Sequence, residues 1–199
     1  MKIAYLVLGI ITLIIVGKRL KALTKRFQPK KSNTHIGESL DPIPAVDSPF
    51  FELRDLALEQ TEESLGLTGD ESELRIYGII MDWNLGEGIV TLTSFKTKEA
   101  SYFLSTGGGV IGGGGHEAVQ IAIINYLDLG KEYLPLTAKI EDTPVPENNE
   151  VYFYFLTNKG IHLGKTVMTT IEDESSPWLL LFIEANKVLT LLNETSENE

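Results

Sequence analysis

A run of glycines between a strand-like and a helix-like stretch has the most evident capacity for ligand chemistry. Residues 106–116 read TGGGVIGGGGH, and seven of the nine residues from 107 to 115 are glycine. Glycine backbone lets a ligand approach closely, and free N–H groups at a helix start, expected here at His116, favour an anion. The alternative is a loop that passes tightly over a neighbouring element or stays flexible. On the first interpretation the ligand-binding residues are Thr106, Gly107, Gly108, Gly109, Gly112, Gly113, Gly114 and Gly115, with Trp83 beside them.

Side chains near this run have the types needed for acid-base or nucleophilic catalysis. His116 would act as the base, Asp82 as the carboxylate that orients it, and Ser105 or Thr106 as the hydroxyl. With the glycines as an anion cradle, such a set predicts a small hydrolase or transferase acting on a phosphate-bearing or acyl substrate. The alternative is structural, because Asp82 is also suited to capping a turn and His116 to capping a helix start.

Two glycine patterns resemble nucleotide-binding motifs but lack their context. Gly107, Gly109 and Gly112 match G-x-G-x-x-G, yet that site requires a βαβ unit, and the strands expected before this run are joined by hairpins. Residues 160–166 resemble a phosphate loop but have three residues between the glycines where four are required. The three histidines lie in separate segments and the chain has no cysteine, so we expect no metal site and no cofactor.

The elements that would position these residues follow from hydrophobic periodicity. In the first expected helix, which starts at Ser48-Pro49, the apolar stripe is Phe50, Leu53, Leu56 and Ala57. The patterns predict helices over 49–65, from 116 to about 129 and after 177, and strands over 74–83, 88–96, 100–105, 151–156 and 161–168.

Short connections between the first three strands predict an antiparallel meander. In a meander the first and third strands run the same way, so Asp82 and Trp83 finish at the same sheet edge as Ser105 and the glycine run, an edge that His116 would also reach. The fold class expected is α+β, with an antiparallel sheet of about five strands in the order α-βββ-α-ββ-α, packed helices and one N-terminal transmembrane helix.

The charge is divided unevenly along the chain. Residues 1–31 hold eight Lys/Arg and no acid, whereas residues 32–199 hold nine Lys/Arg and 28 Asp/Glu; these make +8 and −19, which sum to the net charge of −11. Because a body this acidic repels phosphate backbones, we expect no nucleic-acid partner.

An uncharged apolar segment at residues 3–17 predicts a membrane anchor. Seven Lys/Arg follow it before residue 32, whereas a cleaved signal peptide would be followed by small, uncharged residues. The cations predict a single-pass protein of the bacterial inner membrane, with its globular domain in the cytoplasm and its basic segment near anionic lipid. The expected domains are an anchor over 1–20, a basic and then proline-containing linker over 21–48, a globular domain over 49–193 and an acidic tail over 194–199.

The segment from Met81-Asp82-Trp83 through the glycine run to His116 resembles a bacterial protein family that carries an SxGGGxIGGGxH signature. The resemblance extends over residues 75–193. It implies a bacterial globular module, and because the family has no assigned activity it implies no catalytic residue.

Two functional hypotheses follow from these observations. The first is a membrane-tethered, non-enzymatic module of the immunity or adaptor type that binds a protein partner or small ligand through the glycine-loop edge. The second is the small hydrolase or transferase that uses His116 and Asp82. The distance between these two side chains separates the hypotheses, because proton transfer requires them within hydrogen-bonding reach, directly or through one water.

Overall fold

The computed structural model describes residues 49–70 and 72–196, and a seven-stranded antiparallel sheet forms its centre. The strand order across the sheet is β4-β3-β2-β1-β6-β7-β5. The first three strands form the expected antiparallel meander, since β2 pairs with both β1 and β3. The strands are β1 (Ile76–Asn84), β2 (Ile89–Phe95), β3 (Ala100–Leu104), β4 (Gly109–Val110), β5 (Ala138–Ile140), β6 (Glu150–Thr157) and β7 (Gly160–Val167).

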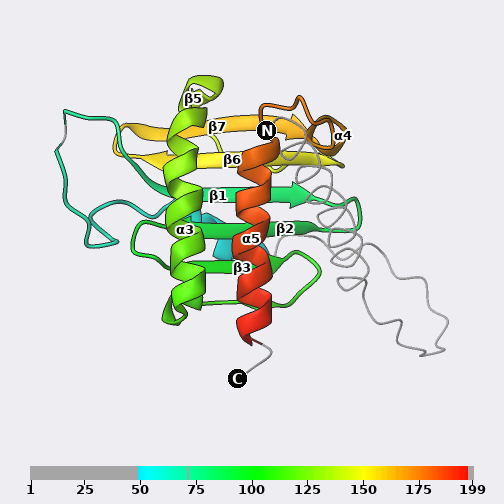
Figure 1. Ribbon diagram of the computed structural model, residues 1–199, viewed down its shortest axis with the longest axis horizontal. Helices are drawn as coiled ribbons and strands as arrows, with labels where there is room; N and C mark the ends of the chain where they lie inside the picture. Colours follow the sequence, from blue (N-terminus) through cyan, green and yellow to red (C-terminus); the bar gives the residue numbers. More distant parts are fainter. Residues whose placement is uncertain (1–48, 71, 197–199) are drawn as a thin grey trace, which may run out of the picture. The chain divides into compact units, whose positions relative to one another are not determined.

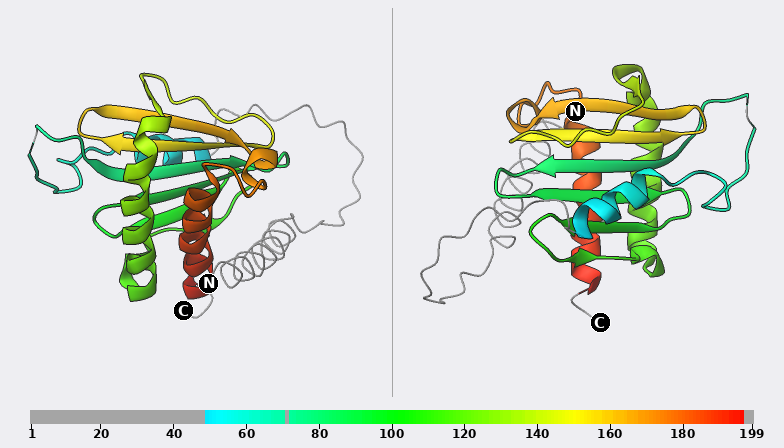
Figure 2. Two further views of the ribbon diagram at one scale, coloured as in Figure 1. Left: turned by 45° about the horizontal axis from the view of Figure 1, so that its top comes forward. Right: turned by 180° about the vertical axis from the view of Figure 1, so that it is seen from behind.

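Helices cover both faces of this sheet. Two long helices, α3 (Glu117–Gly130) and α5 (Leu179–Ser196), lie side by side across the strands on one face (Figure 1). The shorter α2 (Pro49–Leu58) lies on the opposite face, as the view from behind shows (Figure 2). The remaining elements are the 3-10 helices η1 (Gly113–Gly115) and η2 (Lys131–Leu136) and the short α4 (Met168–Ile171).

The coverage of both faces explains why β1 is buried along nearly its whole length. Successive side chains of a strand point to opposite faces, so one set meets each helical layer. Trp83 packs edge-to-face against Phe182 of α5, with 5.2 Å between ring centroids, and its neighbour Asp82 contacts Arg54 of α2. The strand therefore carries a charged side chain inside the protein, between the sheet and α2.

Two glycines let the covering layer approach the strands closely. A Cβ on Gly130, the last residue of α3, would overlap the Ile79 side chain, and a Cβ on Gly164 of β7 would overlap the ring of Trp178. That ring stacks on Phe153 of β6 with 5.4 Å between centroids and an interplanar angle of 6°. The close approach leaves the Trp178 ring and the Phe153 side chain buried.

The structure corrects the predicted fold class in two respects. The sheet has seven strands and not five, because β4 forms within the glycine run and β5 within the connection after α3. No helix among the described residues is long and apolar enough to span a bilayer. Residues 3–17, on which the anchor was predicted, and the predicted linker up to residue 48 lie outside the described residues, so the cytoplasmic localisation stays a prediction. The described residues belong to one unit, Ala45–Glu199.

The buried face of α2 differs from the predicted stripe. Its buried residues are Phe50, Arg54 and Leu58, spaced four apart, whereas Leu56 is 57% exposed. The helix is rotated relative to the predicted orientation because an arginine occupies a core-facing position, opposite the buried Asp82 of the sheet.

Candidate functional site

The glycine run packs against β3 and α5 of the domain. Its central residues form β4, which pairs with β3 so that the run turns back along that strand. Gly107 and Gly108 form the turn before β4 with φ of +94° and +89°, a left-handed backbone that favours glycine. A Cβ on Gly113 would overlap the Cδ2 atom of Leu192, which is buried on α5. These glycines therefore serve turning and close packing.

Amide groups of the run already have acceptors. The Gly112 N–H donates to Ser101 Oγ and the Gly114 N–H donates to Glu99 Oε2, both at 3.1 Å. The Glu99 carboxylate thus sits where an anion would accept a hydrogen bond from the run. An external anion in the predicted cradle would compete with a carboxylate of the protein itself.

The structure does not bring the predicted catalytic residues together. Ser105 follows the last residue of β3, and its Oγ accepts a hydrogen bond of 2.8 Å from the Ile89 N–H. His116 follows η1 at the other end of β3, where Gly114 contacts Glu99, the residue before that strand. The five residues of β3 separate these two ends by roughly 17 Å at about 3.3 Å per residue.

Asp82 lies on β1, two strands from β3, and is committed to other partners. It is fully buried on the α2 side of the sheet. Its Oδ2 atom accepts a hydrogen bond of 2.7 Å from Arg54 Nε, and its Oδ1 atom accepts one of 2.6 Å from the Thr91 hydroxyl. Burial raises the pKa of the Asp82 carboxyl, and the Arg54 guanidinium and the Thr91 hydroxyl oppose that rise. The carboxylate holds α2 on the sheet and is not available to orient a histidine.

Arg54 extends this buried network to the connection before β6. Its Nη2 group donates to the carbonyl oxygens of Thr143 and Pro144 at 3.1 Å and to the Tyr154 hydroxyl at 3.0 Å. Burial, and then the charge of Asp82, raises the pKa of the Tyr154 hydroxyl. The network joins α2, the three strands β1, β2 and β6, and a connection, so its role is structural.

The other two residues of the predicted binding set, Trp83 and Thr106, lie at different depths in the protein. Trp83 is 5% exposed in the core, and Thr106 is exposed beside Gly88. A cleft beside α3 is lined by none of the residues of the predicted catalytic and binding sets.

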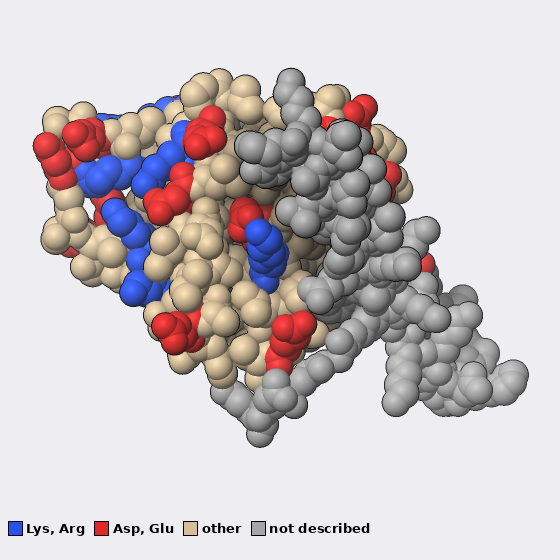
Figure 3. Space-filling model, viewed as in Figure 1, with Lys and Arg blue, Asp and Glu red and all other residues tan. Residues whose placement is uncertain are grey.

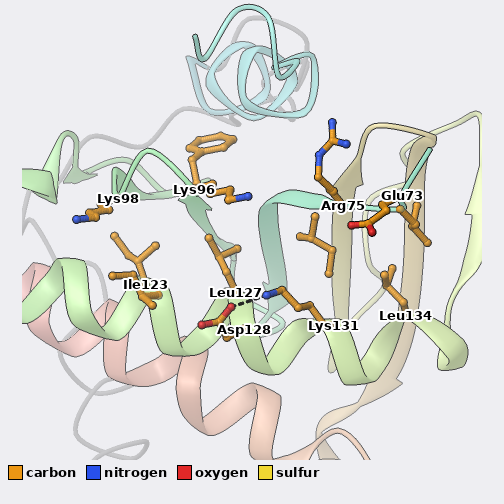
Figure 4. Close-up of a pocket in the computed structure, with 13 residues that line it drawn as sticks. Glu73, Arg75, Lys96, Lys98, Ile123, Leu127, Asp128, Lys131 and Leu134 are labelled. Atoms are coloured by element: carbon orange, nitrogen blue, oxygen red, sulfur yellow. Dashed lines mark hydrogen bonds and ion pairs between the residues drawn. The ribbon is translucent and has the colours of Figure 1, made fainter. Parts of the chain in front are cut away.

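A concave feature lies at the opposite end of the sheet from Ser105, beside α3. This cleft has a volume of about 640 Å³. One wall is the second half of α3 with the start of η2, and the other is formed by the residues leading into β1 and by the turn between β2 and β3 (Figure 4). Its lining consists of Glu73, Leu74, Arg75, Ile76, Phe95, Lys96, Lys98, Ile123, Ile124, Leu127, Asp128, Lys131 and Leu134.

Cations are concentrated in this cleft. Four of the nine Lys/Arg that follow residue 31 line it, against two of the 28 Asp/Glu, so its lining carries 4 − 2 = +2 on a body of −19. In the space-filling view, Lys and Arg side chains gather at the left of the face that carries α3 and α5 (Figure 3). The cleft is therefore a local positive site on an acidic domain, which favours anions there.

The four cations differ in their partners. Arg75 makes two hydrogen bonds to Glu62, of 3.2 and 2.7 Å, and Lys131 pairs with Asp128 at 2.7 Å. Within the described part of the chain no carboxylate pairs with Lys96 or Lys98, both of which are exposed on the β2–β3 turn. Figure 4 shows Lys96 and Lys131 extending from opposite walls toward the middle of the cleft, with Lys98 at one end. The two lysines of the turn are the groups most available to a bound anion.

The sequence predicted the turn at residues 96–99 but assigned it no function. The signal present was the scarcity of cations after residue 31, of which two lie in this single turn. Recognising the cleft also required the pairing of the turn with α3 and with residues 73–76, which are distant in sequence.

Comparison with known protein families, with curated proteins and with solved structures finds no match to this chain. In residues 49–70 and 72–196, no group of three or more His, Asp or Glu side chains is arranged to hold a metal ion. The geometry of the cleft is therefore the main basis for assigning a function.

Proposed function

We propose that this domain is a non-enzymatic binding module that takes up an anionic ligand in the cleft beside α3. The observation that carries the proposal is the concentration there of four of the nine cations found after residue 31. Two of these cations, Arg75 and Lys131, already pair with Glu62 and Asp128. An anion bound in the cleft would compensate the charge of the other two, Lys96 and Lys98. Ligand binding is the function that this distribution of charge supports best.

Two features favour binding over catalysis. Among the described residues that line the cleft there is no His, Ser, Thr or Tyr, the side chains that most often act as nucleophile or proton carrier beside a carboxylate. The carboxylate and histidine of the alternative enzyme hypothesis, Asp82 and His116, are held at separate places in the fold. The proposal keeps the binding role expected from the sequence and moves it from the glycine-loop edge to the cleft.

The proposal is tested with the double variant Lys96→Gln/Lys98→Gln of the full chain. Both side chains are exposed, so the fold should survive the change. Each ammonium near a bound anion contributes up to roughly 1 kcal/mol in a water-exposed setting, or about fivefold in Kd. With citrate or inorganic phosphate as the probe, the double variant should therefore bind at least several-fold more weakly. The measurement is a titration followed by backbone amide NMR shifts.

The matched control is Lys165→Gln/Lys187→Gln, which removes the same net charge at two exposed positions outside the cleft. It should leave the affinity for both anions nearly unchanged. Equal weakening by the two double variants would mean that only net charge matters, and would refute a specific anion site. The shifts of the unaltered protein should also map to residues 73–76, 95–98 and 123–134.

A further inference from the structure

The lining of the cleft is mostly hydrocarbon beneath its cations. Seven of its thirteen residues are apolar, and two of these, Leu74 and Ile124, are 48% and 40% exposed. An inorganic anion would satisfy the lysines and leave this apolar surface in water. A ligand with an apolar body would also remove that surface from water, at about 25 cal/mol per Å².

The lysines of the β2–β3 turn and the apolar side chains of α3 lie on different walls of the cleft. In Figure 4 Ile123 and Leu127 lie along the α3 wall, while Lys96 and Lys98 project from the opposite turn. The volume of about 640 Å³ falls within the range typical of small-molecule sites, about 300 to 1,000 Å³. The site therefore offers apolar side chains on the α3 wall for one part of a small ligand and ammonium groups on the β2–β3 turn for another.

The charge around the cleft argues against a large polyanion. A nucleic acid or an acidic protein would extend beyond the cleft onto a body that holds 28 Asp/Glu against nine Lys/Arg. Repulsion acts over about 8 Å at physiological ionic strength, so such a partner would meet net repulsion outside the lining. A small ligand that stays inside meets mainly the cations.

From these observations we infer that the ligand is a small amphiphile, with a carboxylate or phosphate head held by Lys96 and Lys98 and an apolar body packed against Ile123, Ile124 and Leu127 of α3. This inference rests on the proposed anion site and specifies the class of molecule that the site takes. Carboxylate and phosphate heads share the chemistry that the lysines recognise.

The test compares ligands that separate head from body, with the full chain and NMR titration. Acetate and methyl phosphate present the head alone, octanoate and octyl phosphate present head and body, and octanol presents the body alone. Each methylene that becomes buried should tighten binding up to about fourfold, the ratio that about 0.8 kcal/mol gives. Octanoate and octyl phosphate should therefore bind at least tenfold more tightly than acetate, methyl phosphate and octanol, and the pair with the larger gain identifies the head.

Two variants test whether the gain in affinity from the octyl chain arises in the cleft. Ile124→Gln should reduce the ratio of octanoate to acetate affinity several-fold and leave acetate binding unchanged. Ile121→Gln is the matched control, because Ile121 is 52% exposed one turn earlier on α3 and lies outside the cleft. Equal effects of these two variants, or equal affinities for acetate and octanoate, would overturn the inference.

The outcomes also separate the inference from the proposed function. If Lys96→Gln/Lys98→Gln weakens acetate and octanoate alike while the octyl chain adds nothing, the anion site stands and the amphiphile is refuted. If that double variant has no effect on any charged probe, the anion site itself fails, and the inference fails with it.

Discussion

Replacing Gly113 by alanine tests whether the glycine run is a packing device or a ligand loop. An alanine Cβ at this position would overlap Leu192 Cδ2, and it would lie 3.4 Å from the Ala100 carbonyl oxygen. Leu192 is completely buried on α5, so its side chain cannot move into solvent to make room. The substitution is therefore an overpacking change in the core. Gly115 provides a contrast within the same 3-10 helix, because a Cβ there would meet no atom within 4 Å and its φ is not left-handed.

The magnitude follows from two opposing contributions. Overpacking a closed core costs roughly 1 to 3 kcal/mol, and replacing glycine by alanine returns roughly 0.4 to 1 kcal/mol by restricting the unfolded chain. We therefore expect Gly113→Ala to lower the free energy of unfolding by roughly 1 to 2 kcal/mol. For a chain of this size that is a fall in Tm of roughly 2 to 8 °C. Gly115→Ala should leave Tm unchanged or raise it by a few degrees.

The assay is thermal and urea unfolding of the full chain, followed by circular dichroism and by fluorescence of the two buried tryptophans. A double-mutant cycle with Leu192→Ala tests whether the loss of stability comes from the contact with Leu192. That change alone opens a cavity, and in its background Gly113→Ala should cost nothing, because the overlapping atom is gone; the coupling should exceed 1 kcal/mol. Equal Tm changes at positions 113 and 115, or additivity in the cycle, would show that the packing argument is wrong.

Three further predictions concern the buried network, a histidine and the cleft. Arg54→Met should lower the free energy of unfolding by roughly 3 to 5 kcal/mol, because it leaves the Asp82 carboxylate buried without its cation. Urea denaturation should show that the double variant Arg54→Met/Asp82→Asn recovers at least half of this loss. A double variant as unstable as the single one would contradict the reasoning. Burial, and then the charge of Lys139, lowers the pKa of His162. As the pH falls, the unfolded chain therefore binds a proton at this histidine before the folded chain does, and stability is lost from about pH 6.5 down through the folded pKa. The Tm of His162→Gln should fall less between pH 7.5 and 5 than the Tm of the unaltered protein, and parallel curves would show that His162 does not contribute to the loss of stability. Citrate binding should weaken steeply between about 0.01 and 1 M salt, as the Debye length falls from roughly 30 to 3 Å, and salt-independent titration curves would argue against electrostatic capture.

The regular elements could be predicted because their signals are local. Two-residue alternation located β1, β2 and β3 to within two residues at each end, and the short connections between them imposed antiparallel pairing. The two missed strands lack such a signal. Both are short edge strands. β4 consists of Gly109 and Val110 and pairs with the preceding strand β3, but two residues, one of them glycine, show no alternation. β5 consists of three residues in a proline-containing stretch, and its partner β7 is distant in sequence.

The candidate site was harder to predict because it depends on long-range placement. An arginine on an amphipathic helix is normally interpreted as solvent-facing, and only the sheet reveals that Arg54 lies against Asp82. A signal was present nonetheless, since Asp82 interrupts an apolar strand on the same side as Ile80, where a carboxylate would be buried and would require a cation. The cleft had no comparable signal, because its walls come from segments around residues 75, 97 and 128.

The glycine run still bears on the proposed site, although it does not line it. By turning back along β3 it starts α3 at the end of the sheet that carries the β2–β3 turn, and α3 then forms one wall of the cleft. The run is also bonded to that turn, because the Gly114 N–H donates to the carboxylate of Glu99, the residue after Lys98. Lys98 itself has a left-handed backbone with φ of +69°, a conformation that needs support from its surroundings. The glycines thus let the chain pass close to β3 and to Glu99, and this contact holds both walls of the cleft, which are α3 and the lysine-bearing turn. The run therefore acts by positioning cations that lie outside it.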